Sequence, residues 1–230
     1  MADPTLLDLL EGNRTHVESL PEDHFADVQD GQRPTVVSVC CSDSRVAQEG
    51  MWGVDEPGWL FTPSNIGNQA WDVHDGERVV DGNLLYPLAN TGTRTAVVVG
   101  HTGCGAVTAA YRAVVHDETI DQPGINKWVE SLVPVVEAGL DGPVDETAAE
   151  STVVDQLVEY NVTEQVSFLR AADDVPEDAR VFGFVYDFQG IYGEAPGRTY
   201  LVDADGVTDP EAIAADLPEE YHEHVRSLLG

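Results

Sequence analysis

Residues 35–40 read TVVSVC, and residues 95–100 read TAVVVG. Both stretches are short, rich in β-branched side chains, and apolar at nearly every position rather than at alternate positions. A strand in a parallel sheet is buried on both faces, and a continuous apolar run is typical of such a strand. The two stretches therefore predict two buried strands of a parallel sheet.

Helix-like and strand-like patterns alternate along the rest of the chain. This alternation predicts an α/β fold with a mostly parallel central sheet of four to five strands flanked by helices. The expected helices cover residues 83–89, 107–115, 125–138 and 147–169, and the other expected strands cover residues 59–62, 180–186 and 198–202.

The domain organisation is simple, because no linker, repeat or change of composition divides the chain. We expect a single domain over residues 1–230. Leucines near the start predict a helical arm at residues 1–30, and the acidic end of the chain predicts a peripheral helix at residues 205–230.

The charge balance is strongly acidic: 11 Lys and Arg residues stand against 42 Asp and Glu residues, and the formal net charge is −31. Nucleic acids and anionic membranes are bound through clustered Lys and Arg, so we expect neither as a partner. Hydrophobic residues make up 42% of the chain, which supplies a core and excludes disorder. The acids are dispersed and Lys127 is the only lysine, which favours adaptation to a salt-rich solvent over an acidic protein with a binding tail.

The cysteines and the start of the chain indicate the compartment. The start has neither a basic segment nor a long apolar one, so we expect no signal peptide and no membrane-spanning helix. Cys40, Cys41 and Cys104 are too few for a disulfide framework, and their odd number favours thiol chemistry or metal binding. Strand alternation points Cys40 away from Cys41, so we expect Cys40 in the core. These observations predict a cytoplasmic protein.

Polar and sulfur-containing side chains follow both buried strands directly. Residues 41–45 read CSDSR after the first strand, and residues 101–105 read HTGCG after the second. In an open parallel sheet, ligands bind at the carboxyl ends of the strands. We therefore expect these two segments to meet in one place, although 60 positions separate Cys41 from His101.

The side chains of Cys41, His101 and Cys104 form a donor set that suits Zn²⁺, which prefers sulfur and imidazole nitrogen. Three protein ligands leave a fourth tetrahedral position free for water, and a zinc ion lowers the pKa of that water to about 7. Asp43 lies two residues from Cys41 and is placed to orient the resulting hydroxide. Arg45 can hold Asp43 ionised through a bidentate hydrogen bond.

Other interpretations of the same residues stay open at this point. Asp43 and Arg45 are also compatible with a simple surface ion pair. The glycines of residues 103–105 are compatible with a phosphate cradle at a helix N-terminus, although the chain has no P-loop lysine and no G-x-G-x-x-G. A redox protein in which Cys41 and Cys104 form a disulfide on oxidation, without a metal, is a further alternative.

The two motifs resemble those of the beta-class carbonic anhydrases. The C-S-D-S-R signature of that family matches residues 41–45, and its H-x-x-C-G signature matches residues 101–105. The similarity extends to residues 31–34 (GQRP) before the first strand, to residues 161–166 (NVTEQV) in the late helix, and to residues 183–187 (GFVYD) in the fourth strand. The resemblance indicates a beta-class enzyme, and matches at Gln32, Phe61 and Tyr86 favour the plant-like branch over the bicarbonate-regulated one. The acidic composition favours a salt-adapted organism.

The resemblance implies an enzyme that reversibly hydrates carbon dioxide to bicarbonate and a proton by means of a zinc-bound hydroxide. Cys41, His101 and Cys104 are the implied ligands of Zn²⁺. Asp43 and Arg45 are the implied catalytic residues, with Arg45 holding Asp43 and Asp43 accepting a hydrogen bond from the hydroxide.

The resemblance also implies contacts to CO₂ and bicarbonate in a small apolar pocket. Gln32 matches a glutamine that reaches substrate from the neighbouring subunit, and Phe61 and Tyr86 match aromatic residues that line the pocket in the plant-like branch. A homodimer or higher homo-oligomer follows, with N-terminal helices packing on a partner subunit. Ser64 stands where the family commonly has an arginine, and this departure puts a local ion pair or subunit contact in doubt.

Two further functions fit the same fold and metal. A zinc hydrolase of carbon disulfide or carbonyl sulfide would differ from a carbonic anhydrase in the length and access of its pocket. A non-catalytic zinc module would close the metal site with a fourth protein ligand, for which Asp43 is the candidate. Assays of zinc content and of both types of substrate distinguish these possibilities.

Overall fold

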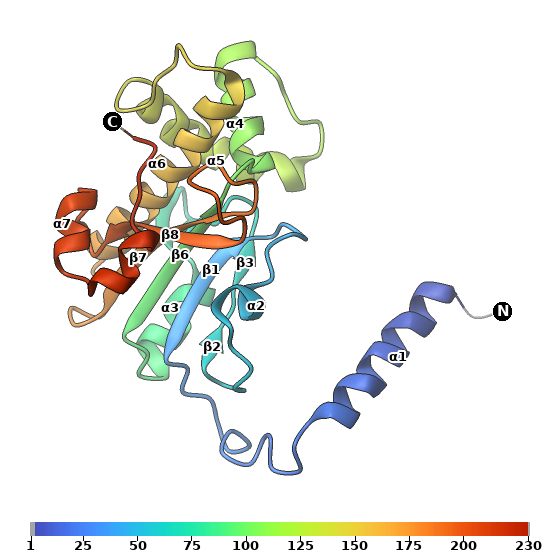
Figure 1. Ribbon diagram of the computed structural model, residues 1–230. Coiled ribbons are helices and arrows are strands. Elements are labelled where there is room, and N and C mark those ends of the chain that lie inside the picture. The colour runs from blue at the N-terminus through green and yellow to red at the C-terminus, as the bar shows by residue number, and fades with distance from the viewer. Residues whose placement is uncertain (1–2, 230) are drawn as a thin grey trace. The chain divides into compact units, whose positions relative to one another are not determined.

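The computed structural model describes residues 3–229 and divides into two compact units, Met1–Gln32 and Arg33–Gly230. The larger unit contains the central sheet and both signature motifs (Figure 1). Residues 1, 2 and 230, which belong to the expected arm and the expected C-terminal helix, lie outside the described residues.

The central sheet is made of β1 (Val36–Cys41), β2 (Leu60–Phe61), β3 (Ser64–Asn65), β6 (Thr95–His101), β7 (Arg180–Asp187) and β8 (Arg198–Ala204). Its order is β2-β1-β6-β7-β8, and the short β3 also pairs with β1. Strands β2, β1, β6 and β7 run parallel, whereas β8 is antiparallel to β7. The predicted α/β fold with a mostly parallel sheet is confirmed, and the two apolar stretches form neighbouring strands within it.

The flanking helices are α3 (Gly82–Asn90), α4 (Gly105–His116), α5 (Pro123–Leu140) and α6 (Glu150–Ala171). Helix α6 approaches β6 and β7 closely because Gly100 and Gly183 have no side chains there. A Cβ atom on Gly100 would lie 2.8 Å from a methyl group of Val162. This close approach holds α6 against the carboxyl end of β6, next to the second signature motif (Figure 1).

The apolar core occupies both faces of the sheet, and β1 contributes to each face in turn. Cys40 is fully buried in a cluster with Val97, which Trp52 of α2 (Gln48–Trp52) covers. Cys41 points into the other and larger cluster, which lies under the flanking helices. The prediction that Cys40 is a core residue is confirmed.

A small hairpin formed by β4 (Trp71–His74) and β5 (Glu77–Val80) goes beyond the elements expected from the sequence. Its turn consists of Asp75 and Gly76, which have φ angles of 51° and 84°. Two successive positive φ angles are the geometry of a two-residue hairpin turn that follows the twist of its strands.

The C-terminal segment forms two short helices where the sequence predicts one helix within residues 205–230. These are α7 (Pro210–Ala215) and the 3-10 helix η1 (Glu219–His224). Pro218 stands between them, and a proline removes a backbone donor and disfavours helical geometry in the residue before it. The break therefore has a local cause in the sequence.

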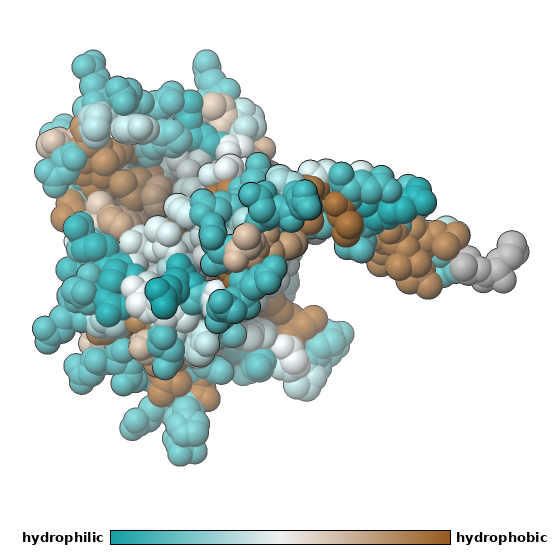
Figure 2. Space-filling model, turned by 90° about the horizontal axis from the view of Figure 1, so that it is seen from below, coloured by the Kyte–Doolittle hydropathy of each residue, from teal (hydrophilic) through white to brown (hydrophobic). Residues whose placement is uncertain are grey.

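The N-terminal unit consists of α1 (Pro4–Ser19) followed by turns. Asp3 caps the helix by accepting hydrogen bonds from the amides of Thr5 and Leu6. No residue of α1 is buried, and its apolar side chains gather along one side of the helix (Figure 2). Neither α1 nor any other helix within residues 3–229 is both long enough and apolar enough to cross a membrane.

Candidate metal centre

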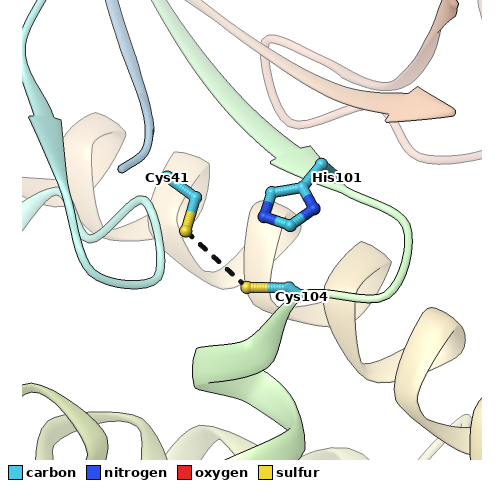
Figure 3. A group of neighbouring side chains, drawn as sticks. All are labelled: Cys41, His101 and Cys104. Carbon is cyan, nitrogen blue, oxygen red and sulfur yellow. Dashed lines mark hydrogen bonds between the residues drawn. The ribbon is translucent and has the colours of Figure 1, made fainter. Parts of the chain in front are cut away.

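Three side chains that can bind a metal meet at the carboxyl end of the sheet. Cys41 is the last residue of β1, His101 is the last residue of β6, and Cys104 precedes the first turn of α4. Gly103 has a φ of 62° and turns the chain between His101 and Cys104, so that both side chains approach Cys41 (Figure 3). All three residues are buried, and their ligand atoms lie within 4.8 Å of one another.

The distances and hydrogen bonds of this group fit a zinc ion. The Sγ atoms of Cys41 and Cys104 are 3.8 Å apart, and two sulfurs bound at about 2.3 Å to a tetrahedral zinc ion would be separated by about 3.8 Å. His101 Nδ1 lies 3.0 Å from the carbonyl oxygen of Thr102 and donates its proton there, which leaves the lone pair on Nε2. Within residues 3–229 the buried Nε2 atom has no hydrogen-bond partner, as a metal-binding nitrogen requires.

The two cysteines of the group differ in acidity. The thiol of Cys104 donates a hydrogen bond to the sulfur of Cys41, and this contact lowers the pKa of Cys41 to about 5. The same contact, together with burial, raises the pKa of Cys104 well above its usual range. Cys41 is therefore the more acidic of the two thiols, and a metal cation between the two sulfurs would favour the deprotonated form of both.

Asp43 and Arg45 form a clamp beside these residues. Arg45 Nε and Nη2 donate hydrogen bonds of 2.8 and 2.7 Å to the two carboxylate oxygens of Asp43, and the amide of Arg45 donates a third of 2.9 Å. The hydrogen bonds from Arg45 hold the pKa of Asp43 well below its usual range. Asp43 Oδ2 lies 3.7 Å from His101 Nε2. The ionised carboxylate therefore borders the space between the three candidate ligands.

Two residues of the site are missed by the sequence reasoning. The ring of Phe188 stacks on His101 with centroids 5.8 Å apart, and the guanidinium carbon of Arg45 lies 4.4 Å from the ring centre. Phe188 directly follows β7, so the rule that sites form at the carboxyl ends of parallel strands could have found it. The amide of Gly67, which donates a hydrogen bond to Cys41, comes from a loop that carries no such signal.

Phe61 and Tyr86, the expected pocket residues, lie together but away from the candidate ligands of their own chain. Their ring centroids are 6.3 Å apart. Phe61 pairs with Val37, which is four residues before Cys41, and four residues of a parallel strand span about 13 Å. Tyr86 is 47% exposed. This aromatic pair therefore lies near the opposite end of β1, where Phe61 packs against the core and Tyr86 faces solvent.

Gln32 and Ser64 complete the residues singled out from the sequence. Gln32 is exposed and is the last residue of the N-terminal unit. Ser64 accepts a hydrogen bond of 3.1 Å from Gln48 Nε2, so a neutral pair occupies the position of the family's arginine. Asn65 makes two hydrogen bonds of 2.8 Å with the backbone of Gln69 and thereby fixes the loop that follows β3.

Comparison with known proteins gives a consistent result. The family model for carbonic anhydrase matches residues 36–191. Carbonic anhydrase 2 of Mycobacterium tuberculosis is 30% identical over 202 residues, which cover 85% of this chain and 90% of that protein. A carbonic anhydrase of Pseudomonas aeruginosa is 31% identical over 170 residues, which cover 72% of this chain and 74% of that protein.

Solved structures share the fold. The beta-carbonic anhydrase of Coccomyxa, in complex with acetazolamide, superposes with a TM-score of 0.70 at 22% identity and covers 96% of both chains. A beta-carbonic anhydrase of Sordaria macrospora, described as tetrameric, superposes with a TM-score of 0.71 at 20% identity, covering 87% of this chain and 98% of its own.

The fold and the site together define a zinc enzyme in which a Cys-His-Cys set lies at the carboxyl end of a parallel sheet. The family match covers most of the chain and includes both signature motifs. The chain therefore belongs to the carbonic anhydrase family, and its fold makes it a beta-class member. Its reaction is the reversible hydration of carbon dioxide.

Proposed function

We propose that Cys41, His101 and Cys104 hold the zinc ion of this carbonic anhydrase, while neighbouring side chains position water and CO₂. One observation carries the proposal: three donor atoms lie within 4.8 Å of one another, and the buried Nε2 of His101 has no other partner within residues 3–229. When bound, zinc lowers the pKa of a coordinated water to about 7 and so supplies a nucleophile at neutral pH.

Asp43 is proposed to orient the attacking water. Because Arg45 holds it ionised, its carboxylate accepts hydrogen bonds and donates none, so Oδ2 fixes the direction of a hydrogen atom of the water. Arg45 is itself held by the ring of Phe188, which limits rotation of the clamp. The same clamp restrains Asp43 from moving to the metal, which favours a catalytic site over a closed structural one.

A second copy of the chain is proposed to complete the substrate pocket. Phe61 of β2 pairs with β1 four residues before Cys41, too far to reach the ligands of its own chain, and Tyr86 of α3 lies beside Phe61. Tyr86 is half exposed and available to a neighbour. Gln32 is proposed to contribute across the same boundary. We propose a homodimer or higher homo-oligomer with a pocket of the plant-like type, in which the exposed leucines of α1 pack on the partner.

Salt adaptation and a cytoplasmic location are proposed from composition and cysteine chemistry. The acidic side chains buried within residues 3–229 are Asp81, Asp155, Glu159, Asp187 and Asp203, so most of the 42 acids are at least partly exposed. A dense negative surface with one lysine suits a solvent that screens charge. The three free thiols suit a reducing compartment.

The test measures zinc content and CO₂ hydration on the same purified chain, with carbon disulfide and carbonyl sulfide assayed in parallel. We expect one zinc ion per chain, and a hydration rate that a chelator abolishes and added zinc restores. A folded chain without zinc, or a zinc-loaded chain that acts on a sulfur analogue but not on CO₂, would overturn the proposal. Cys104→Ser should remove both zinc and activity.

A further inference from the structure

We propose that Asp155 is a positioning residue for the metal centre: its buried carboxylate fixes the turn between His101 and Cys104 and thereby sets the affinity for zinc. This inference rests on the ligand set proposed above. Asp155 lies on α6, outside both signature motifs, and within residues 3–229 its hydrogen bond goes to Gly103 rather than to one of the three ligands.

A single hydrogen bond links Asp155 to the turn. Its Oδ1 atom accepts a hydrogen bond of 2.8 Å from the amide of Gly103. The residue is 3% exposed, and a buried carboxylate costs free energy unless strong hydrogen bonds compensate. The compensating donor here is the backbone of the residue immediately before Cys104, so the carboxylate and the turn stabilise each other.

The two residues between the ligands are held by different elements. The amide of Thr102 donates to the carbonyl of Tyr186 at 3.1 Å, and its hydroxyl lies 3.3 Å from Asp187, so the β7 strand and its end hold the first half of the turn. The second half, at Gly103, is held by Asp155 of α6. Loss of the Asp155 bond would therefore loosen the half of the turn that leads into Cys104.

Helix α6 also anchors the loop on the other side of the centre. The side-chain amide of Asn161 donates to the carbonyl of Gly67 at 3.2 Å, and Gln165 accepts from the amide of Ala70 at 2.7 Å while donating to Asn161 at 2.9 Å. Gly67 is the residue whose amide contacts the sulfur of Cys41. The same helix thus supports the turn that leads into Cys104, through Asp155, and the loop that contacts Cys41, through Asn161 and Gln165.

The experiment replaces Asp155 by leucine, which has a similar volume but no acceptor, and by asparagine, whose Oδ1 can still accept from Gly103. Zinc affinity is measured by competition with a chelator, and the geometry of the ligand set is followed by the visible spectrum of the Co²⁺-substituted protein. We expect Asp155→Leu to weaken zinc binding about 10- to 100-fold, which is the usual effect of removing a residue that supports metal ligands from outside. We also expect it to change the Co²⁺ spectrum. Asp155→Asn should stay close to the wild type in both.

Glu159→Gln is the matched control, because Glu159 is a buried carboxylate on the same helix, one turn later. Its partners are the hydroxyl of Tyr192 at 2.7 Å, the hydroxyl of Ser227 and the amide of Leu228 at 2.8 Å, and none of these residues belongs to the His101–Cys104 turn. We expect Glu159→Gln to lower thermal stability and to leave zinc affinity and the Co²⁺ spectrum unchanged.

The proposal is overturned if Asp155→Leu binds zinc as tightly as the wild type, or if Asp155→Asn is as weak as Asp155→Leu. If Asp155→Leu does not fold, hydrogen exchange at the Gly103 amide of the zinc-loaded wild type decides: strong protection supports the bond, and exchange at the rate of a free amide overturns it. A wild-type chain that binds no zinc would instead overturn the ligand set, so the two failures are distinguishable.

Discussion

Cys40 and Cys41 are neighbours on β1 and are both buried, yet the two faces of the strand give them opposite chemistry. Cys40 packs among apolar side chains such as Val97, and burial raises the pKa of its thiol. Cys41 faces Cys104, whose hydrogen bond lowers its pKa to about 5. Strand alternation and the surroundings that it selects, rather than residue type or depth of burial, therefore decide which thiol can serve as a ligand.

Replacing each cysteine by alanine in turn tests this difference between the two faces most directly. Cys41→Ala should lose zinc and lower CO₂ hydration by at least about three orders of magnitude, because the nucleophile at neutral pH depends on the metal. Cys40→Ala should keep zinc and activity and lower the free energy of unfolding by about 1 kcal/mol, the usual cost of a modest change in a core. Metal analysis, stopped-flow hydration and chemical denaturation measure the three quantities.

The pair of variants is informative because both changes remove the same atom from adjacent positions. An active, zinc-loaded Cys41→Ala variant would contradict the ligand set. A Cys40→Ala variant that loses zinc while remaining folded would show that the two faces of β1 are not independent.

The clamp on the Cys41 side of the strand gives the next largest effect. Arg45→Gln removes the bidentate contact with Asp43, so the carboxylate can rotate and no longer directs the water. We expect kcat/KM to fall about 10- to 100-fold with zinc content unchanged. Arg45→Lys should fall by an intermediate amount, because an ammonium group lacks the planar fork of a guanidinium. Stopped-flow rates and metal analysis on the same samples test this.

Arg112→Gln is the control for charge removal. Arg112 pairs with Glu150 at 2.8 Å, and both side chains are substantially exposed, so the loss of this pair should leave kcat/KM unchanged. Equal losses of activity in Arg45→Gln and Arg112→Gln would show that net charge, rather than the Asp43 contact, controls the rate.

The three ligands could be predicted from sequence because each of them follows a buried strand, and the carboxyl ends of parallel strands share one edge. Asp155 could not be assigned to the site in the same way, because its contact with Gly103 depends on how α6 crosses the sheet. The role of Phe61 and Tyr86 could not be assigned from the sequence alone either, because the sequence of one chain does not show how copies of the chain assemble.

The elements of the fold also differ in how strongly the local sequence predicts them. The long apolar strands and the helices α3 to α6 carry strong local patterns and are predicted correctly, whereas the short α2 after β1 is not expected from the sequence. The hairpin of β4 and β5 carries the Asp75-Gly76 turn signal, but its strands are only four residues long and mostly exposed, so their apolar pattern is weak. The prediction of a single C-terminal helix is wrong, because Pro218 interrupts helical geometry despite the helical pattern around it.

Carboxylates extend the comparison made for the cysteines. Asp43 is held by Arg45 and its pKa is lowered, whereas Asp203 on β8 is buried and its pKa is raised to about 6, chiefly because burial disfavours the charged form. Between about pH 4 and pH 6 the folded chain keeps a proton on Asp203 that the unfolded chain has lost, so stability falls as the pH rises through this window.

Asp203→Asn should therefore be more stable than the wild type at pH 7 by about 1–2 kcal/mol, since one unit of pKa corresponds to about 1.4 kcal/mol and the new amide hydrogens offset part of the gain. The asparagine oxygen can still accept from Gly206. The advantage should vanish near pH 4. Denaturation curves across this pH range measure it, and an equal effect at both pH values would assign it to packing instead.

Asp205→Asn is the matched control of opposite sign. At Asp205 the effect of burial is outweighed by the amide of Val181 and by Arg180 and Arg170, so its pKa is lowered. Its charged form is the one that the folded chain favours. Asp205→Asn should therefore destabilise the protein at pH 7, and the loss should shrink as the pH falls below the usual range of a carboxyl group.

The smallest expected effect concerns the exposed acids, which differ from Asp43 in having few cations to pair with: 11 Lys and Arg residues cannot neutralise 42 acids. Their mutual repulsion is long-range and is screened by salt, whereas the short contacts of the metal centre are not. Raising KCl from 0.1 M to 1 M should therefore raise the midpoint of thermal unfolding by about 2–4 °C, equivalent to about 1 kcal/mol for a chain of this size. NaCl at equal ionic strength should give the same rise, because screening depends on ionic strength rather than on the cation. A chain that is fully stable and assembled in dilute buffer would argue against salt adaptation while leaving the zinc chemistry untouched.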